Sequence, residues 1–404
     1  MYLSLIIVSC FDRRSREPGG VNDTARVHHA ARRHGSVAFG GHAQQGAMPV
    51  VGMLVLYFAA LWSSERVAAE TVDQLWARAK EEKVLVLWAA GPNAGYERIA
   101  RTFEERFPGI TVKLTDGLSN VLNAKIEEQL STNKVETDLA ILQTIQDFIA
   151  WNRRGLLLAF KPDGFDAISS QSKDKNGAWV AVSKDPILYG YTKIEQVLPH
   201  DVPRLALDFL NSRYRGKTIT VDPAENDATL FAFTTIVKKY GWSFMTQYMK
   251  QQPKFVQGHL AVARSLAAGE SLVSFDTTVR SALEVKRAGA KIELAVPTDD
   301  YLPVSFSAEA ILKNAPHPYA AKLFVTWLLS KEWQSRTGLY SPRSDVPEPA
   351  DLPSLSRHRL EERYAEFVSN ENLIAEVRKA LRKLQQTSLI LTTVTSSSRL
   401  GCGH

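Results

Sequence analysis

A chain of 404 residues is long enough for two domains of ordinary size. Hydrophobic residues make up 45% of it and charged residues 23%, which is typical of a soluble globular protein. The formal net charge of +6 is small for this length and is dispersed along the chain. Composition therefore excludes a strongly basic nucleic-acid-binding surface, and we expect no nucleic-acid partner.

The N-terminal region carries the pattern of an export signal. An apolar run from Val50 to Trp62 is too short to span a membrane as a helix but fits the core of a signal peptide, and Ala69 suits cleavage before Glu70. We therefore expect a signal peptide over 48–69 and a periplasmic protein; the alternative is a buried core helix. Residues 1–47 lack periodicity, and we expect a non-native or disordered prefix before a true start near Met48.

Strands and helices alternate through 70–184. Thr71 with Gln74 forms a capping-box pattern at the start of a helix over 71–82. The apolar runs predict strands over 84–88, 110–114 and 139–142, with helices after each of them, the last closed by Gly155. This order predicts a mostly parallel sheet flanked by helices, which we assign as lobe 1.

The same alternation returns in 185–296, which we assign as lobe 2. A strand over 179–183 precedes Asp185, followed by strands over 218–221, 271–275 and 292–296 and helices over 230–240 and 279–288. The fold class is therefore α/β, with two lobes, each a mostly parallel sheet flanked by helices, joined by a hinge. We expect the chain to cross between lobes near 183–187 and 296–303. Residues 297–385 return to lobe 1 and form C-terminal helices, and 386–404 is a polar tail outside them. Cys10 and Cys402 lie outside the predicted core, so we expect no disulfide.

Three phrases of the sequence carry a family resemblance. They run from Tyr214 to Pro223, from Ala267 to Phe275 and from Ala310 to Gln334. In this order they resemble the extracellular solute-binding proteins of ABC importers, in the branch that includes the ferric-iron binders, which share the type II periplasmic binding protein fold. The resemblance implies a monomer, without catalytic residues or cofactor, that closes over a small solute by hinge motion and delivers it to an inner-membrane permease.

Loops between strands and helices are the expected places for a ligand. In open α/β sheets, ligands bind beyond the carboxyl ends of strands, where helix N-termini present unpaired N–H groups and partial positive charge. The resemblance implies that Ser119, Asp185 and Thr277 contact the ligand or line its pocket. The candidate ligand-binding residues are Ala90, Gly91, Ser119, Asn120, Asp185, Asn226, Thr229, Asp276, Thr277 and Arg280.

Each polar candidate also has a structural alternative. Ser119, Asn120 and Thr229 are equally compatible with simple helix capping. In the structural alternative for Asp185, this residue only ends a strand and does not contact the ligand. Arg280, like Arg264, would belong to a solvated helix face.

The sequence departs from the ferric binders at one point. Those proteins carry two adjacent tyrosines just after the strand that here is expected to end at Phe275, whereas this chain has Asp276, Thr277 and Thr278 and no adjacent tyrosine pair. We therefore expect no metal site and a small polar or anionic solute; a ferric-iron or other metal-ion binder is the alternative.

Enzyme motifs are incomplete. Gly216-Lys217-Thr218 lacks the glycine that a phosphate-binding loop needs, because Asn211 stands there. A secreted enzyme on the same fold remains the second alternative, since fold does not fix function.

Overall fold

The computed structural model describes residues 70–91, 93–193 and 197–399, with side chains except for Asn93 and 388–399. The expected prefix, the signal peptide and both cysteines lie outside the described residues. Among the described helices, none combines the length and the apolar character that crossing a membrane requires.

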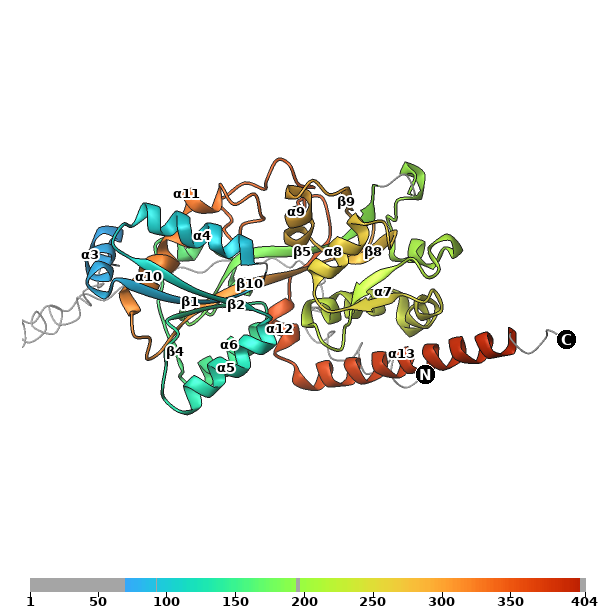
Figure 1. Cartoon of the computed structure of the whole chain (residues 1–404), viewed down its shortest axis with the longest axis horizontal. Coiled ribbons are helices and arrows are strands. Elements are labelled where there is room, and N and C mark those ends of the chain that lie inside the picture. The colour runs from blue at the N-terminus through green and yellow to red at the C-terminus, as the bar shows by residue number, and fades with distance from the viewer. Residues whose placement is uncertain (1–69, 92, 194–196, 400–404) are drawn as a thin grey trace, which may run out of the picture. The chain divides into compact units, whose positions relative to one another are not determined.

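Helices and strands alternate along the chain, as Figure 1 shows. The first elements are α3 (Val72–Glu82), β1 (Val84–Ala90), α4 (Asn93–Arg106), β2 (Thr111–Gly117), α5 (Ser119–Ser131), β3 (Leu139–Leu142), α6 (Ile145–Arg153) and β4 (Leu157–Leu158). The middle elements are β5 (Val180–Thr192), β6 (Ile219–Val221), α7 (Asp227–Lys250), β7 (Lys254–Val256), α8 (His259–Ala267), β8 (Val273–Thr278), α9 (Val279–Arg287) and β9 (Ile292–Ala295). The last elements are β10 (Leu302–Leu312), α10 (Pro318–Leu328), α11 (Lys331–Gln334), β11 (Leu360–Glu361), α12 (Tyr364–Val368) and α13 (Glu371–Arg399).

The first lobe is built on the strand order β2-β1-β3-β10-β5. Strand β1 runs parallel to β2 and β3, as the alternating sequence predicts, whereas β10 runs antiparallel to β3 and β5. The α/β class is confirmed. Strand β10 was not predicted, because Ser305, Ser307 and Glu309 interrupt its apolar residues with polar ones.

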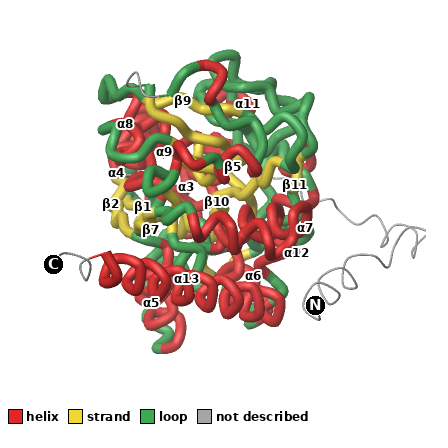
Figure 2. The backbone as a smooth tube through the Cα atoms, turned by 90° about the vertical axis from the view of Figure 1, so that its right-hand side faces the viewer, coloured by secondary structure: helices red, strands yellow, loops and turns green. Residues whose placement is uncertain are grey.

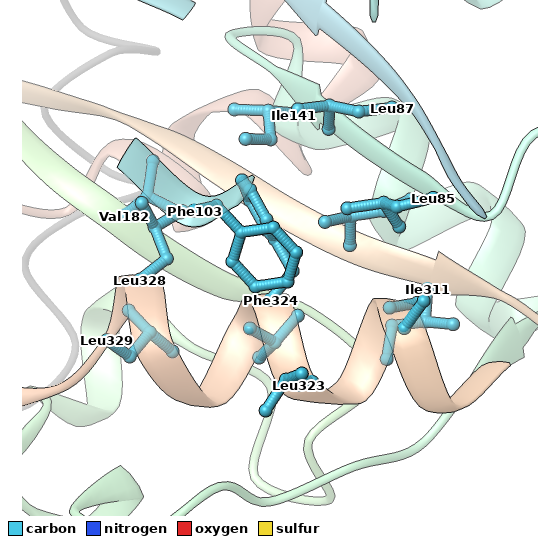
Figure 3. Close-up of a cluster of buried hydrophobic side chains, with 14 of the residues drawn as sticks. Leu85, Leu87, Phe103, Ile141, Val182, Ile311, Leu323, Phe324, Leu328 and Leu329 are labelled. Carbon is cyan, nitrogen blue, oxygen red and sulfur yellow. The ribbon is translucent and has the colours of Figure 1, made fainter. Parts of the chain in front are cut away.

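A hydrophobic cluster fills the first lobe between the sheet and its helices (Figure 3). Leu85 and Leu87 of β1 and Ile141 of β3 face Phe324 of α10, and Phe103 of α4 packs on Phe324 with ring centroids 5.0 Å apart. Burying an aromatic side chain of this kind contributes roughly 1.5–3 kcal/mol. Helix α3 joins this core after the predicted capping box, in which Thr71 and Gln74 satisfy each other's backbone N–H groups.

The second lobe has its own smaller core. Ile219 of β6, Val262 and Leu266 of α8, Ala282 of α9 and Ile292 of β9 are fully buried together. Strands β6 and β7 are parallel, and β8 and β9 both pair antiparallel with the second half of β5.

Strand β5 connects the lobes directly. Its first half pairs with β10 as far as Pro186 opposite Val304, and its second half pairs with β8 from Ile187 opposite Thr278. The change of partner falls between Pro186 and Ile187. The chain comes back to the first sheet between β9 and β10.

Several element boundaries differ from the sequence predictions, and strand β5, predicted over 179–183, continues to Thr192. Strand β8 continues to Thr278 rather than ending at Phe275, because Thr277 and Thr278 pair with Leu188 and Ile187 of β5. Helix α7 continues after a break at Gly241, whose φ of 76° lies in the left-handed region that glycine adopts at little cost. Helix α13 continues to Arg399, into the expected polar tail, since extending a formed helix adds a hydrogen bond for each residue fixed. Figure 2 shows α13 as a long helix in front of α5 and α6.

Candidate functional site

A cleft of about 510 Å³ lies where loops of both lobes meet. From the first lobe it is lined by the ends of β1 and β2 and the starts of α5 and α6; from the second, by the starts of α7, α8 and α9. Its lining includes seven of the ten candidates, namely Ala90, Gly91, Ser119, Asn120, Asp185, Asn226 and Arg280. The loops that the sequence singled out therefore do converge, and Thr229, Asp276 and Thr277 do not line the cleft.

Helix N-termini dominate the walls of this cleft. The residues before α5, α6, α8 and α9 are Leu118, Thr144, Gly258 and Thr278, and none of them caps its helix with a side-chain hydrogen bond. Each helix follows a strand, so its first N–H groups emerge at the carboxyl end of the sheet. Two of these helices belong to each lobe. Their first turns therefore present N–H groups and partial positive charge to a shared space.

None of the three residues given the capping alternative is an N-cap: Thr229 lies inside α7 and donates its Oγ1 hydrogen to Asp276, and a different residue caps that helix. Asn226 is the N-cap of α7, and its Oδ1 accepts a hydrogen bond from the Thr229 N–H at 2.9 Å. Ser119 is not a cap: its Oγ accepts from the Gln143 N–H at 3.1 Å and so ties the β2–α5 loop to the β3–α6 loop. Asn120 Oδ1 accepts from the adjacent Val121 N–H at 3.0 Å.

Asp276 is a buried structural carboxylate behind the cleft wall. Its Oδ2 accepts hydrogen bonds from Thr220 Oγ1, Val221 N–H and Thr229 Oγ1 at 2.9–3.1 Å, and its Oδ1 lies 3.0 Å from His259 Nε2. Burial alone would raise its pKa, but His259 and these donors together hold the pKa of Asp276 below its usual value. Both carboxylate oxygens therefore bind groups within the protein, and Asp276 does not line the cleft.

Thr277 is also enclosed. It is fully buried on β8 and packs against Gly190 of β5, where there is no space for a Cβ atom. The loop expected after Phe275 is therefore a strand, and the contribution of this segment to the cleft begins at Thr278.

Asp185 and Arg280 meet on the floor of the cleft. Asp185 does not end a strand, because β5 continues to Thr192. Its Oδ2 accepts hydrogen bonds from Ser307 Oγ at 3.0 Å and from Ser183 Oγ at 3.4 Å. Arg280 is not on a solvated face: its Nη2 donates to Ser183 Oγ at 2.6 Å, and its Nε lies 3.8 Å from Asp185 Oδ1. Arg264, by contrast, is exposed at the rim.

The C-terminal helices supply contacts that sequence reasoning missed. Tyr364 of α12 lines the cleft and donates its hydroxyl to the Gln143 carbonyl at 3.3 Å. Asp227, at the start of α7, accepts from Gln146 of α6 at 2.5 Å and pairs with Arg378 of α13. Local sequence patterns do not predict these contacts, because Tyr364 and Arg378 lie well over a hundred residues from their partners.

The described residues hold no group of three or more His, Cys, Asp or Glu side chains arranged to bind a metal ion. Tyr189 is not available to the cleft either, because it is buried and donates its hydroxyl to Asp300 Oδ2 at 2.9 Å.

Two α/β lobes joined by β5 and β10, with a ligand-sized cleft between helix N-termini, define a type II periplasmic binding protein. A family model described as bacterial extracellular solute-binding protein matches residues 89–335. The chain belongs to this family, as the resemblance in its sequence predicted. Its role is that of the substrate-binding component of an ABC transporter.

Other proteins resemble this chain in sequence or in structure at low sequence identity. An uncharacterized protein of Haemophilus influenzae is 25% identical over 260 residues, covering 62% of this chain and 74% of that protein. Iron-bound HitA from Pseudomonas aeruginosa superposes with a TM-score of 0.60 at 18% identity, and AfuA from Actinobacillus pleuropneumoniae, with fructose-6-phosphate bound, with a TM-score of 0.62 at 20% identity. Each match covers 74% of this chain and 99% of the other. At such identities the likeness shows the fold alone.

Proposed function

We propose that this protein captures a small anionic solute in the cleft and delivers it to a membrane permease, without catalysis. The observation that carries the proposal is the convergence of four helix N-termini without side-chain caps, two from each lobe. An anion between them would satisfy N–H groups of both lobes at once. Because these contacts form only when the lobes approach each other, such an anion favours the closed state.

The charged side chains of the cleft support the same choice. Arg280 and Arg264 add positive charge on the side of the second lobe. The carboxylate of Asp227 is engaged by Arg378, and that of Asp185 faces Arg280. AfuA, with its bound sugar phosphate, shows that a protein of this fold accepts an organic anion.

The metal-ion alternative rests on HitA, which binds iron on the same fold. In the described residues of this chain the cleft carboxylates lie beside arginines, which repel a cation. We therefore favour anion binding over metal-ion binding. Binding of ferric citrate with a visible absorption band would favour it instead.

The proposal also states which residues form each lobe and how the protein is exported. Lobe 1 comprises 70–184 with 297–385, and lobe 2 comprises 185–296. The mature protein is a periplasmic monomer that begins near Glu70 after removal of 48–69. N-terminal sequencing of the periplasmic protein tests the export step, and an intact Met1 or Met48 would contradict it.

Introducing a negative charge at one helix N-terminus tests the anion proposal. Asn120 is the second residue of α5 and lines the cleft, whereas Asn370 precedes α13 outside the cleft lining and accepts a hydrogen bond from the Leu373 N–H. Asn120→Asp should weaken binding of small organic phosphates and carboxylates by about tenfold or more, which corresponds to about 1.4 kcal/mol. The matched Asn370→Asp variant should bind as the unmodified protein does. Isothermal titration calorimetry with a panel of anions and uncharged sugars measures both.

Neither variant should lose stability, because a carboxylate near a helix N-terminus is favourable by roughly 0.3–1 kcal/mol. The proposal of anion binding would be contradicted if Asn120→Asp and the unmodified protein bound anions equally well, or if only uncharged sugars bound.

A further inference from the structure

Two buried polar atoms on the cleft floor lack hydrogen-bond partners among the described residues. They are Asp185 Oδ1, on the strand that connects the lobes, and Arg280 Nε, in the first turn of α9. Asp185 is only 6% exposed, and both residues line the cleft. The two charges face each other, but burying polar atoms of charged groups without hydrogen bonds is costly, so this arrangement requires an explanation.

The remaining atoms of the two side chains are held firmly. Ser307 and Ser183 donate to Asp185 Oδ2, and Ser183 also accepts from Arg280 Nη2. Ser183 therefore fixes both members of the pair. The carboxylate and the guanidinium cannot turn toward each other without breaking these bonds, so Oδ1 and Nε stay 3.8 Å apart, too far for a direct hydrogen bond.

The chemistry of the two atoms determines which ligand group can form hydrogen bonds with both of them. Oδ1 only accepts hydrogen bonds, and Nε only donates them. An ammonium group or a metal ion would suit Oδ1 but meet the positive charge of Arg280, and an anionic oxygen would suit Nε but meet the negative charge of Asp185. A hydroxyl group donates through its hydrogen and accepts through its lone pairs. One oxygen can lie at normal hydrogen-bond distance, about 2.7–3.0 Å, from two atoms with this separation.

We infer that Asp185 and Arg280 determine specificity by binding a hydroxyl group of the solute. This inference rests on the proposed function and extends it: the solute is a hydroxylated anion, such as a sugar phosphate or a polyhydroxy acid, with its anionic group at the helix N-termini and a hydroxyl group at this pair. Both atoms are enclosed in the described conformation. The hydroxyl group therefore enters when the lobes are apart and is shielded from water when they close.

Pairs of anions that differ only in their hydroxyl groups test the inference on the mature protein. Glycerol 3-phosphate is compared with propyl phosphate, and gluconate with hexanoate, by isothermal titration calorimetry. In the unmodified protein the hydroxylated member of at least one pair should bind tenfold or more tightly. Asp185→Asn should reduce that preference to threefold or less while changing the affinity for the deoxy member little.

Two further variants separate recognition from folding. Ser307→Ala keeps both charged groups but loosens the carboxylate, so it should reduce the same preference by a smaller factor. Glu332→Gln changes an exposed carboxylate of α11 outside the cleft lining and should leave the preference unchanged. Absence of any hydroxyl preference, or an equal loss for both members in Asp185→Asn, would overturn the inference. Anion binding without that preference would still leave the proposed function intact, whereas failure of every anion to bind would remove both.

Discussion

The buried carboxylate of Asp276 joins three elements of the second lobe, namely the end of β6 and the starts of α7 and α8. It accepts hydrogen bonds from β6 and from α7, and it lies beside His259 at the start of α8. Helices α7 and α8 both begin at the cleft, so this one side chain fixes the relative positions of two of its walls. Its influence on ligand binding is thus indirect, through the backbone that it holds.

We predict that Asp276→Ala destabilises the protein strongly. The change leaves the buried donors Thr220 Oγ1, Val221 N–H and Thr229 Oγ1 without their acceptor, and each unpaired buried polar group costs about 1–3 kcal/mol. Urea unfolding followed by circular dichroism measures the loss. Asp116→Ala, at an exposed position of β2, serves as the control and should change the free energy of unfolding by less than about 0.5 kcal/mol. A variant as stable as the unmodified protein would show that Asp276 is not structural.

At the scale of elements, the packing of β5 on its neighbours limits what the chain tolerates. Gly190 lies where β8 and α8 approach β5 closely: an added Cβ would overlap Thr277 Oγ1 and lie 2.8 Å from Leu266 Cδ1. Gly95, near the start of α4, has only the end of the Arg98 side chain within 4 Å of an added Cβ. The two glycines therefore serve different purposes, although the sequence does not distinguish them.

Alanine substitution at these two glycines should have opposite effects. Gly190→Ala should destabilise the protein by about 1–3 kcal/mol, since β5 and β8 must separate to accommodate the methyl group. Gly95→Ala should stabilise it by up to about 1 kcal/mol, because alanine favours the helix and restricts the unfolded chain. Thermal unfolding by calorimetry compares the two. A shift of the melting temperature in the same direction for both would contradict the assigned close approach.

Considered as a whole, the molecule shows what sequence patterns can and cannot predict. The short apolar runs at Leu85 and Leu139 and the strand-to-helix loops after them were predicted, and so were seven cleft residues, because both follow from local periodicity. The polar strand β10 and the cleft contact of Tyr364 were not, since they depend on pairing between distant segments. Asp276 was predicted to lie in a ligand-binding loop, because its local sequence pattern resembles one. In the structure, buried donors from three other elements hold it in a strand.

Contacts between lobes should make the stability of the molecule depend on pH. Helix α6 of the first lobe carries Asp147 close to Asp227 of α7 in the second, and burial, together with the charge of Asp227, raises the pKa of Asp147 to about 6. In the unfolded chain the same carboxyl titrates at its ordinary value, near 3.8. Between these two values the folded state binds more protons than the unfolded state, so the contribution of Asp147 to stability falls as the pH rises and is fully lost above about 6.

Asp147→Asn should remove this dependence. A difference of about two pKa units corresponds to roughly 2–3 kcal/mol, so the variant should gain up to that amount over the unmodified protein at pH 7 and gain nothing below pH 4. Unfolding in urea at a series of pH values measures the difference, with Asp116→Asn as the exposed control. A gain that is independent of pH would mean that Asp147 acts through packing and that repulsion across the lobes is negligible. A gain confined to neutral pH would show that ionisation of the buried Asp147 is what costs stability, with burial as the largest cause and the charge of Asp227 as a smaller one.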